Sequence, residues 1–182
     1  MGLNDEVGRR LKELRQDAGL SLSELARRSG VGKGTLSELE SGRRNPTLET
    51  LYALTTVLGR PLSAVLDDPQ SGERESPRGV SGSAVTAVLV ERYEDAAAAT
   101  DVFRVTIADG ATQESTAHVP RTTESLMVLS GTAVVGLPHA PQTAGPGAHA
   151  HWPADEPHLY SAPHGEVHGI LFVRYPKGPS PS

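Results

Sequence analysis

The sequence predicts a multidomain fold in which a bundle of short α-helices is followed by an all-β sandwich or barrel. Three observations support this prediction. Apolar residues recur every three to four positions through residues 4–66, which is the period of a helix. Short β-rich runs such as VFRVTIA and GILFVRY alternate with turn residues through residues 83–176. Between them, residues 67–82 contain almost no apolar side chain, which is typical of a linker. We therefore expect a helical domain over residues 1–66, a flexible linker, a β domain, and a disordered tail over residues 177–182.

The expected helices have recognisable ends. Each of the first four is followed by a glycine, which is common just after the last turn of a helix. These glycines are Gly19, Gly30, Gly42 and Gly59. Capping residues start three of the helices: Asn4, Ser21 and Thr47. Glu24 follows Ser21 at the spacing of a capping box, and Pro61 suits the first turn of a short fifth helix. Five short helices in about 65 residues predict a compact bundle.

The composition narrows the compartment and the partners. The chain has no cysteine, so disulfide bonds and thiolate metal sites are excluded and a reducing compartment is expected. The N-terminus is charged rather than apolar, and no apolar run approaches the ~18 residues of a membrane span. We expect a cytoplasmic protein without a membrane partner. Residues 1–66 carry ten Lys and Arg against eight Asp and Glu, net +2, whereas residues 67–182 carry seven against fourteen, net −7. Only the helical part favours a polyanionic partner.

The stretch GVGKGTLSELESG, residues 30–42, raises the question of what the helical part binds. Its GKGT core looks like a phosphate-binding loop. A Walker loop, however, needs a glycine, four residues and then Gly-Lys-Ser/Thr, and it follows a buried strand. Here Gly34 follows Lys33 and a helix precedes the stretch, so spacing and context both exclude a nucleotide loop. The stretch fits a helix, a tight turn at Gly30 and a second helix that can lie in a DNA major groove.

Residues 4–66 resemble the helix-turn-helix domain of the XRE, or lambda-repressor-like, transcriptional regulators. The segments that carry the resemblance are SELARRSGV, GTLSELESGRRNPTL and LGRPLSAVL, which occur together in this order. The resemblance implies a five-helix, lambda-repressor-like DNA-binding bundle. In that family the start of the third helix meets bases and the loop after it meets phosphates. The matching base-facing candidates are Lys33, Gly34, Thr35, Ser37 and Glu38. The matching phosphate-facing candidates are Arg43, Arg44 and Asn45.

The chemistry of these side chains agrees with those roles. Lys33 can donate hydrogen bonds to guanine, and Glu38 can accept one from cytosine. Thr35 and Ser37 suit either bases or phosphates, whereas an arginine such as Arg43 supplies attraction to phosphate that is independent of sequence. The alternative is that the charged residues are solvated surface charges with no partner in DNA.

The β-rich part contains AHVPRTTESLMVLSGTAVVG and HWPADEPHLYSA, which are similar to the two motifs of the cupin family. This resemblance extends over about residues 84–176 and implies a cupin, which is a double-stranded β-helix barrel. It also implies that His118, Glu124 and His158 converge inside the barrel. The first motif of metal-binding cupins has a second histidine, and Pro120 takes its place here.

Two interpretations of His118, Glu124 and His158 stay open. Two imidazoles and one carboxylate are the minimum set for a divalent metal, as a facial triad for Fe(II) or an open site for Zn²⁺, Mn²⁺ or Ni²⁺. In a barrel without metal, the same residues would line a ligand pocket and hydrogen-bond a small molecule or each other.

Other residues near these motifs are assigned to structure. Trp152 is expected in the core of a strand, which turns His149 and His151 outward. Tyr160 is likewise expected to be a core aromatic rather than part of a site. Arg121 is expected in a solvated turn.

The two resemblances together imply a sequence-specific DNA-binding transcriptional regulator, a repressor, that reads double-stranded operator DNA. Its cupin barrel is expected to sense an unknown small-molecule effector and to mediate homodimerisation, and no catalytic residue is expected. The alternative is a metal-dependent cupin enzyme resembling hydroxypropylphosphonate epoxidase, in which a helix-turn-helix domain also precedes a cupin with a two-His-one-Glu iron site. Pro120 argues against that enzyme because its ligand spacing differs. A further alternative is a DNA-bound scaffold whose barrel only oligomerises.

Overall fold

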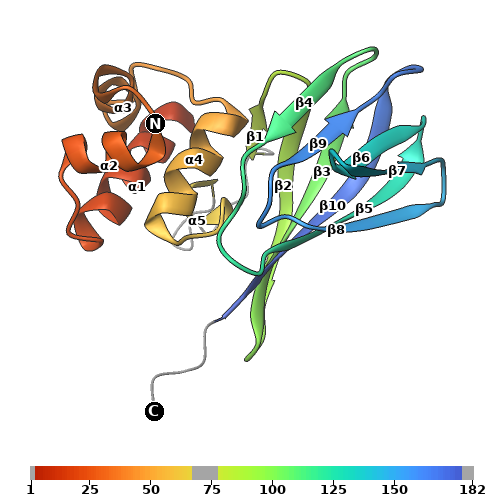
Figure 1. Ribbon diagram of the computed structural model, residues 1–182. Coiled ribbons are helices and arrows are strands. Elements are labelled where there is room, and N and C mark those ends of the chain that lie inside the picture. Colours follow the sequence, from red (N-terminus) through yellow and green to blue (C-terminus); the bar gives the residue numbers. More distant parts are fainter. Residues whose placement is uncertain (1–2, 67–77, 178–182) are drawn as a thin grey trace.

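The computed structural model describes residues 3–66 and 78–177, in which five helices are followed by ten strands (Figure 1). The helices are α1 Leu3–Asp17, α2 Leu22–Ser29, α3 Lys33–Glu40, α4 Leu48–Leu58 and α5 Ser63–Leu66. The strands are β1 Arg78–Ser81, β2 Val85–Glu94, β3 Ala98–Ile107, β4 Thr112–Ser115, β5 Thr123–Ser130, β6 Ala133–Leu137, β7 Ala140–Ala144, β8 His149–Pro153, β9 His158–Ser161 and β10 Val167–Pro176. The predicted order of a helical bundle and an all-β part is confirmed. No helix in the described residues is long and apolar enough to span a membrane.

Local signals set several helix ends at the residues that the sequence indicates, but two predicted starts are wrong. Helix α1 begins at Leu3, so Asn4 lies inside it and donates to the side chain of Asn45 instead of capping, and α5 begins at Ser63, two residues after Pro61.

The Ser21 hydroxyl accepts a hydrogen bond from the N–H of Glu24 (3.1 Å), and the Thr47 hydroxyl accepts one from the N–H of Thr50 (3.2 Å). After α2, Gly30 has a φ of 71°, a left-handed conformation that glycine adopts without strain. The tight turn between α2 and α3 follows from this glycine.

Leucines from the first four helices form the core of the bundle. The fully buried ones belong to a single cluster: Leu11, Leu25, Leu36, Leu51 and Leu54. Burying one such side chain contributes about 1.5–3 kcal/mol. Because α3 packs on α1 and α2 through this core, its opposite side faces solvent.

Two antiparallel sheets make up the β part (Figure 1). The six-stranded sheet has the order β1-β2-β3-β10-β5-β8, and the four-stranded sheet has the order β4-β9-β6-β7. Buried and outward residues alternate along the strands, with Leu171, Val173 and Tyr175 of β10 pointing inward. The core lies between the two sheets.

Strand β8 forms one edge of the six-stranded sheet. The side-chain amide of Gln142, on β7, donates a hydrogen bond to the carbonyl of His151 (2.6 Å). The Gln142 oxygen accepts one from the N–H of His151 (3.4 Å). Pro153, at the end of the strand, has no N–H to donate. The backbone of this edge is therefore partly occupied.

The linker prediction, residues 67–82, is wrong at its C-terminal end. Arg78–Ser81 form β1, which pairs antiparallel with β2. The physical reason is that β2 offers a free edge and that Val80 gains burial there, with 7% of its surface exposed. The rest of the predicted linker, residues 67–77, lies outside the described residues.

The predicted tail, residues 177–182, is also corrected at its first residue. The backbone N–H of Lys177 donates to the carbonyl of Ala97 (2.8 Å), and its ammonium group lies 3.1 Å from the Glu94 carboxylate. These contacts tie the end of β10 to the turn between β2 and β3. Residues 178–182 lie outside the described part of the chain.

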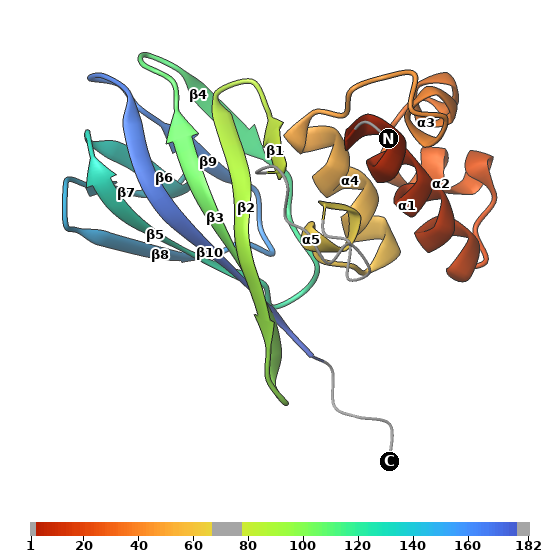
Figure 2. The same cartoon turned by 180° about the vertical axis from the view of Figure 1, so that it is seen from behind.

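The helical and β parts contact each other through α4 and α5, as Figure 2 shows from behind. The N–H of Ser63 donates to the carboxylate of Asp101 on β3 (3.1 Å), and Arg92 on β2 donates to the Ser63 hydroxyl (2.6 Å). The carboxylate of Glu49 on α4 accepts a hydrogen bond from the N–H of Ser83 (2.7 Å). The two parts are therefore docked, in addition to being joined by the chain.

Candidate DNA-binding surface and buried polar site

Helix α3 presents the predicted base-reading residues on its outer side. Leu36 and Leu39 are buried and fix the helix to the bundle. On the other side Lys33, Gly34 and Glu38 are exposed. The two remaining candidates, Thr35 and Ser37, are half-buried at the margin of this side. An exposed helix side with a lysine at its N-terminal end has the form required to enter a major groove.

The predicted phosphate-facing residues follow α3 in an exposed loop, Arg43, Arg44 and Asn45. The guanidinium of Arg44 lies 3.3 Å from the carboxylate of Glu38, and both side chains are about half exposed. Asn45 accepts a hydrogen bond from the side chain of Asn4. Glu38 is thus paired with Arg44 in the free protein, and this pair has to rearrange before Glu38 meets a base.

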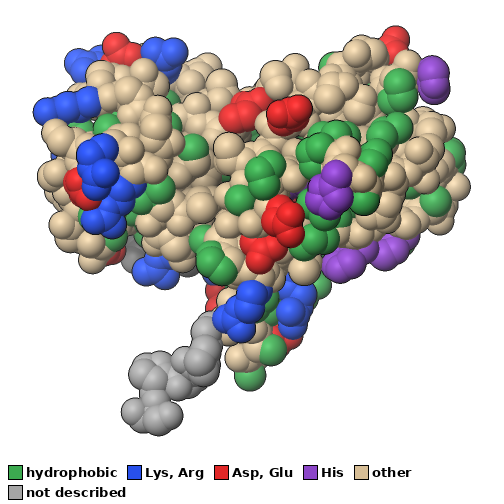
Figure 3. Space-filling view, in the orientation of Figure 1, with side chains coloured by type: hydrophobic (Ala, Val, Ile, Leu, Met, Phe, Trp, Pro, Cys, Tyr) green, Lys and Arg blue, Asp and Glu red, His purple; other side chains and the backbone are tan. Residues whose placement is uncertain are grey.

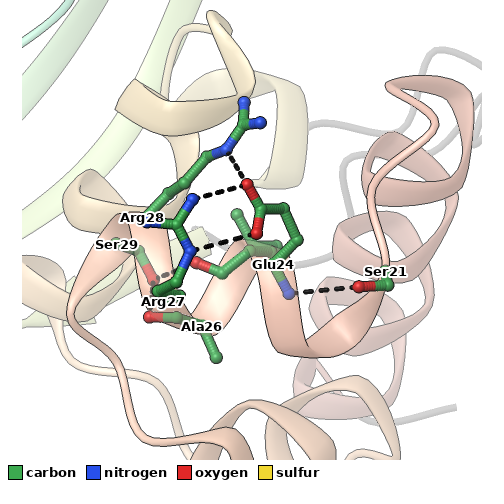
Figure 4. A network of polar contacts seen from close by, with 7 residues as sticks. Ser21, Glu24, Ala26, Arg27, Arg28 and Ser29 are labelled. Carbon is green, nitrogen blue, oxygen red and sulfur yellow. Dashed lines mark hydrogen bonds and ion pairs between the residues drawn. The ribbon is translucent and has the colours of Figure 1, made fainter.

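A second exposed cationic group lies on α2 (Figure 4). The Glu24 carboxylate accepts hydrogen bonds from Arg27 (2.7 Å) and Arg28 (2.6 Å). The hydrogen bonds from the two arginines lower the pKa of Glu24 to about 2, so it stays ionised at neutral pH. The sequence reasoning did not include these arginines in the DNA-binding surface, although their spacing from Glu24, three and four residues, predicts the pairing.

The charged side chains are distributed unevenly over the molecule (Figure 3). In this view lysines and arginines gather on the helical part and at the lower end of the β part, whereas histidines lie over the β part and most acidic side chains near the middle. This arrangement matches the net charges of +2 for residues 1–66 and −7 for residues 67–182. The electrostatic attraction for a polyanion is concentrated on the helical part.

The interior of the β part brings the three predicted polar residues together. His118 follows β4, Glu124 lies on β5, and His158 begins β9. Their nitrogen and oxygen atoms lie within 4.8 Å of one another. The side chains are 1%, 0% and 0% exposed, respectively. We call this group the polar triad.

Hydrogen bonds orient each member of the polar triad. The Nε2 atom of His118 lies 2.9 Å from one Glu124 oxygen, and the Nε2 atom of His158 lies 3.3 Å from the other. The Nδ1 atom of His158 lies 2.8 Å from the carbonyl of Glu156, where it donates. That hydrogen bond turns the Nε2 atom of His158 toward the carboxylate, as is usual for a metal-binding histidine.

The carboxylate of Glu124 is ionised in spite of its burial. Burial raises the pKa of Glu124, but the charges of His158 and His118 and hydrogen bonds from His118 and Tyr160 outweigh this effect and hold the pKa at about 2. A buried anion needs a cationic partner close by. The polar triad therefore requires either a protonated imidazole or a bound cation.

Tyr160 contributes to this site, which corrects its assignment as a plain core aromatic. Its hydroxyl donates a hydrogen bond to Glu124. Burial and the charge of Glu124 raise the pKa of Tyr160 well above its usual value, so the phenol remains a donor. Since Tyr160 follows His158 by two residues on the same strand, the period of a strand could have identified it. Trp152, by contrast, is a core residue, only 1% exposed.

The polar triad fits a divalent metal in its donor set. Two imidazoles and one carboxylate are the donor set of a facial triad, and their ligand atoms lie within 4.8 Å of one another, so they would have to move closer together to bind one ion. His118, Glu124 and His158 would hold the ion. With Fe, Mn, Ni or Zn bound, the site would supply a Lewis acid or a coordination position for a ligand oxygen.

A residue of the helical part closes the polar triad. Tyr52, on α4, stacks on His118 with ring centroids 4.1 Å apart and planes inclined by 22°. Only 5% of Tyr52 is exposed. Nothing in the sequence near Tyr52 predicts this contact, because it depends on how the two parts dock.

The remaining side chains near the motifs lie where the sequence predicts. His149 and His151 are exposed on β8, whereas Ala150 between them is buried. Arg121 is exposed in a turn, with a φ of 66°, and its N–H donates to the Asp155 carboxylate (2.7 Å). In the part of the chain that the structure describes, these residues form no second cluster of possible metal ligands.

Comparison with known proteins identifies the helical part and relates the whole chain to transcriptional regulators. Residues 11–65 match the Helix-turn-helix family model HTH_3. The HTH-type transcriptional regulator SutR of Escherichia coli K12 is 31% identical over 169 residues, which are 92% of this chain and 93% of SutR. A crystal structure of an HTH_3 family transcriptional regulator from Vibrio cholerae superposes with a TM-score of 0.80, at 29% identity, covering 96% of this chain and 98% of that one. The cupin_2 domain of an XRE family transcriptional regulator from Enterobacter cloacae aligns with 43% of this chain and 83% of its own, at 29% identity and a TM-score of 0.41.

Proposed function

The chain belongs to the family of HTH-type transcriptional regulators, and from that premise we propose that it is a cytoplasmic repressor whose barrel senses a small molecule. The observation that carries the proposal is the combination, in one chain, of an exposed side of α3 that leads into a loop with two exposed arginines and of a buried polar triad. The first feature can bind operator DNA. The second can bind a small molecule through one carboxylate and two imidazoles. A protein that covers a promoter excludes polymerase without further contacts, which is why we propose repression.

The proposed DNA contacts divide by chemistry. Lys33 lies at the N-terminal end of α3, where it would donate to guanine, and Thr35 and Ser37 would assist along the same helix. Arg43 and Arg44 lie in the next loop and would contact phosphates. This division separates sequence reading from general attraction.

We propose that two copies bind an operator together, because one small helix-turn-helix domain buries too little surface to be specific alone. The outer side of β5 offers a surface for a second copy. Met127 and Leu129 are 44% and 56% exposed there. Their neighbours on β10, Ile170 and Phe172, are half-buried on the same side, and Ile170 is paired with Met127. Exposed apolar side chains that adjoin in this way are typical of a protein interface.

The dimer is tested by charge substitutions at this surface. We expect the wild type to be dimeric by light scattering after size exclusion, and Met127→Lys with Leu129→Lys to weaken association at least about tenfold. Tyr93→Lys, at a position 50% exposed on β2, is the matched control. A double variant that remains as dimeric as the control would exclude this surface.

The regulatory function is tested by selecting bound sequences from random double-stranded DNA. We expect enrichment of two half-sites whose centres are about one helical turn apart. A promoter carrying these sites should be less active in cells that contain the protein. Failure to enrich any sequence would contradict the DNA-reading proposal.

A metal-dependent enzyme is the second candidate, and the observation that favours it is the two-His-one-Glu composition of the polar triad. Elemental mass spectrometry on protein purified without chelator distinguishes the possibilities. About one Fe, Mn, Ni or Zn per chain, lost in His118→Ala and His158→Ala, supports a metal site. Oxygen consumption by iron-loaded protein with added small-molecule acids would then favour the enzyme. Metal-free protein would restrict the search to organic effectors.

A further inference from the structure

We propose that Tyr52 is the gate of the polar triad, so that docking of the helical part and occupation of the barrel exclude each other. This inference rests on the proposed sensory function of the barrel. It adds the means by which an effector inside the β part is transmitted to the helix that reads DNA. It assigns that role to a direct contact between the two parts, rather than to the chain segment that joins them.

The first step is the position of the Tyr52 ring. It stacks on His118 at 4.1 Å, and His118 in turn lies 4.9 Å from the ring of His158. The side chain of His118 is 1% exposed, although it belongs to a connection between strands rather than to the sheet core. A ring from α4 thus occupies the space over the imidazole that an effector would otherwise contact.

The second step is that the polar end of Tyr52 also has its partner in the β part. Its hydroxyl hydrogen-bonds with that of Tyr175 on β10. The Tyr175 hydroxyl also lies within hydrogen-bonding reach of the N–H of Leu62 (3.5 Å). Burial and the charges of Glu124 and Asp101 raise the pKa of Tyr52 well above its usual value, so it is a neutral phenol here. In the docked form, the ring of Tyr52 therefore packs on His118 and its hydroxyl bonds to Tyr175.

The third step concerns what moves if Tyr52 leaves. Leu51 and Leu54, on either side of Tyr52 in the sequence, belong to the same buried cluster as Leu25 of α2 and Leu36 of α3. Close packing of this kind does not permit α4 to shift alone. A movement of α4 that withdraws the Tyr52 ring from the barrel therefore carries the other helices with it, including the side of α3 that carries Lys33.

The fourth step is thermodynamic. An effector larger than a metal ion that contacts His118 needs the space of the Tyr52 ring, so it binds the undocked form more tightly than the docked form. Differential affinity of this kind shifts the equilibrium between the two forms. By linkage, DNA that selects one arrangement of the helical parts changes the affinity for the effector by the same factor.

The gate is tested by the chemical accessibility of the histidines. Diethyl pyrocarbonate acylates exposed imidazoles, and mass spectrometry of the peptides reports the rate at each histidine. In the wild type we expect fast reaction at His149 and His151, which serve as internal standards, and slow reaction at His118. In Tyr52→Leu we expect the rate at His118 to rise about two- to tenfold, which corresponds to the free energy of an aromatic stack.

Matched variants separate gating from general destabilisation. Leucine at position 52 keeps the apolar packing and suits a helix, so the bundle is expected to remain folded. Tyr52→Phe keeps the stacked ring and should keep His118 protected. Tyr93→Leu removes an exposed tyrosine and should change nothing. Thermal unfolding of each variant checks that the accessible His118 belongs to folded protein.

Two results would overturn the gate. One is a His118 that stays protected in folded Tyr52→Leu, and the other is a His118 that reacts as fast as His149 in the wild type. A calorimetric titration with Zn²⁺ on the same proteins tests separately whether the polar triad binds a metal ion. Without Zn²⁺ binding in any variant the metal site fails, while the acylation rates still decide the gate.

Discussion

The DNA-binding surface and the polar triad are built in opposite ways. The surface comes from one continuous stretch, residues 33–45, in which Lys33, Glu38, Arg43 and Arg44 are exposed to water. The triad draws His118, Glu124 and His158 from separate elements and buries all three side chains. A site made from consecutive residues can be recognised in the sequence by its motif. A site made by topology is recognised only as far as the fold itself is known.

The same difference determines what each charge contributes to stability. The Arg44–Glu38 pair has side chains that are 55% and 48% exposed, and such pairs contribute about 0–1 kcal/mol. The buried contacts of Glu124 contribute more to stability. Removal of one buried partner leaves the other buried polar groups without a hydrogen-bond or charge partner. The surface charges are therefore free to serve recognition, whereas the buried charges are tied to folding.

The largest expected effect on stability comes from a substitution in the polar triad. Glu124→Ala removes the anion that accepts from His118 and Tyr160, and we expect the free energy of unfolding to fall by about 3–5 kcal/mol. Urea denaturation measures the change. Glu114→Ala, at an exposed position on β4, is the control and should change little. A loss below about 1 kcal/mol for Glu124→Ala would remove the contrast between the two regions.

A smaller effect is expected at the base-reading position. Lys33→Ala should weaken binding to the selected operator by about 1–3 kcal/mol and relax the preference at one base pair. Fluorescence anisotropy with operator and scrambled DNA measures both. Lys12→Ala, on the exposed side of α1, is the matched control. Equal losses on the two DNAs would mean that Lys33 does not read a base.

Arg43→Ala should act differently from Lys33→Ala. We expect weaker binding to all sequences and a decrease of about one in the slope of log affinity against log salt concentration. Arg60→Ala, which removes an exposed arginine after α4, is the control. An unchanged salt slope for Arg43→Ala would argue that its guanidinium does not contact phosphate.

The smallest expected effect is at Glu49, which joins the helical part to the β part. Burial raises the pKa of Glu49, but hydrogen bonds from the backbone N–H of Ser83 and from other groups outweigh it, so the pKa is lowered. A lowered pKa in the folded state stabilises the protein above the unfolded pKa, about 4.3, and this contribution disappears as the pH falls through the folded value.

We therefore expect Glu49→Gln to cost up to about 1 kcal/mol at pH 7 and progressively less below pH ~4. Thermal unfolding as a function of pH measures the difference from the wild type. Glu91→Gln, at an exposed position on β2, is the control. If the loss of stability in Glu49→Gln did not depend on pH, the charge of Glu49 would not contribute to the contact between the helical and β parts.

Most of the fold was predictable because its signals are local. Ser21, Thr47 and Gly30 end helices by contacts or dihedral angles within a few residues. Strand β1 was not predictable from its own composition, because its stability comes from pairing with β2. Within the polar triad, the motif spacing identified the three main residues. Tyr160 followed from strand periodicity but was assigned to the core.

Tyr52 lies beyond what the sequence can indicate. Its position on α4 reads as one more apolar residue of a helix, and its partner His118 is 66 residues away along the chain. The contact depends on how the helical and β parts dock, and the buried apolar residues of both parts form one cluster. Long-range docking of this kind leaves no periodic pattern in either part.

The edge strand β8 has a consequence for how copies of this protein associate. An open edge can extend a sheet from molecule to molecule without limit, which leads to filaments and aggregation. Here the amide of Gln142 occupies both backbone groups of His151, and Pro153 ends the strand without a donor. These contacts oppose growth by strand addition at this edge. The proposed contact through the side of the sheet would instead be twofold, and a twofold contact closes on itself at two copies.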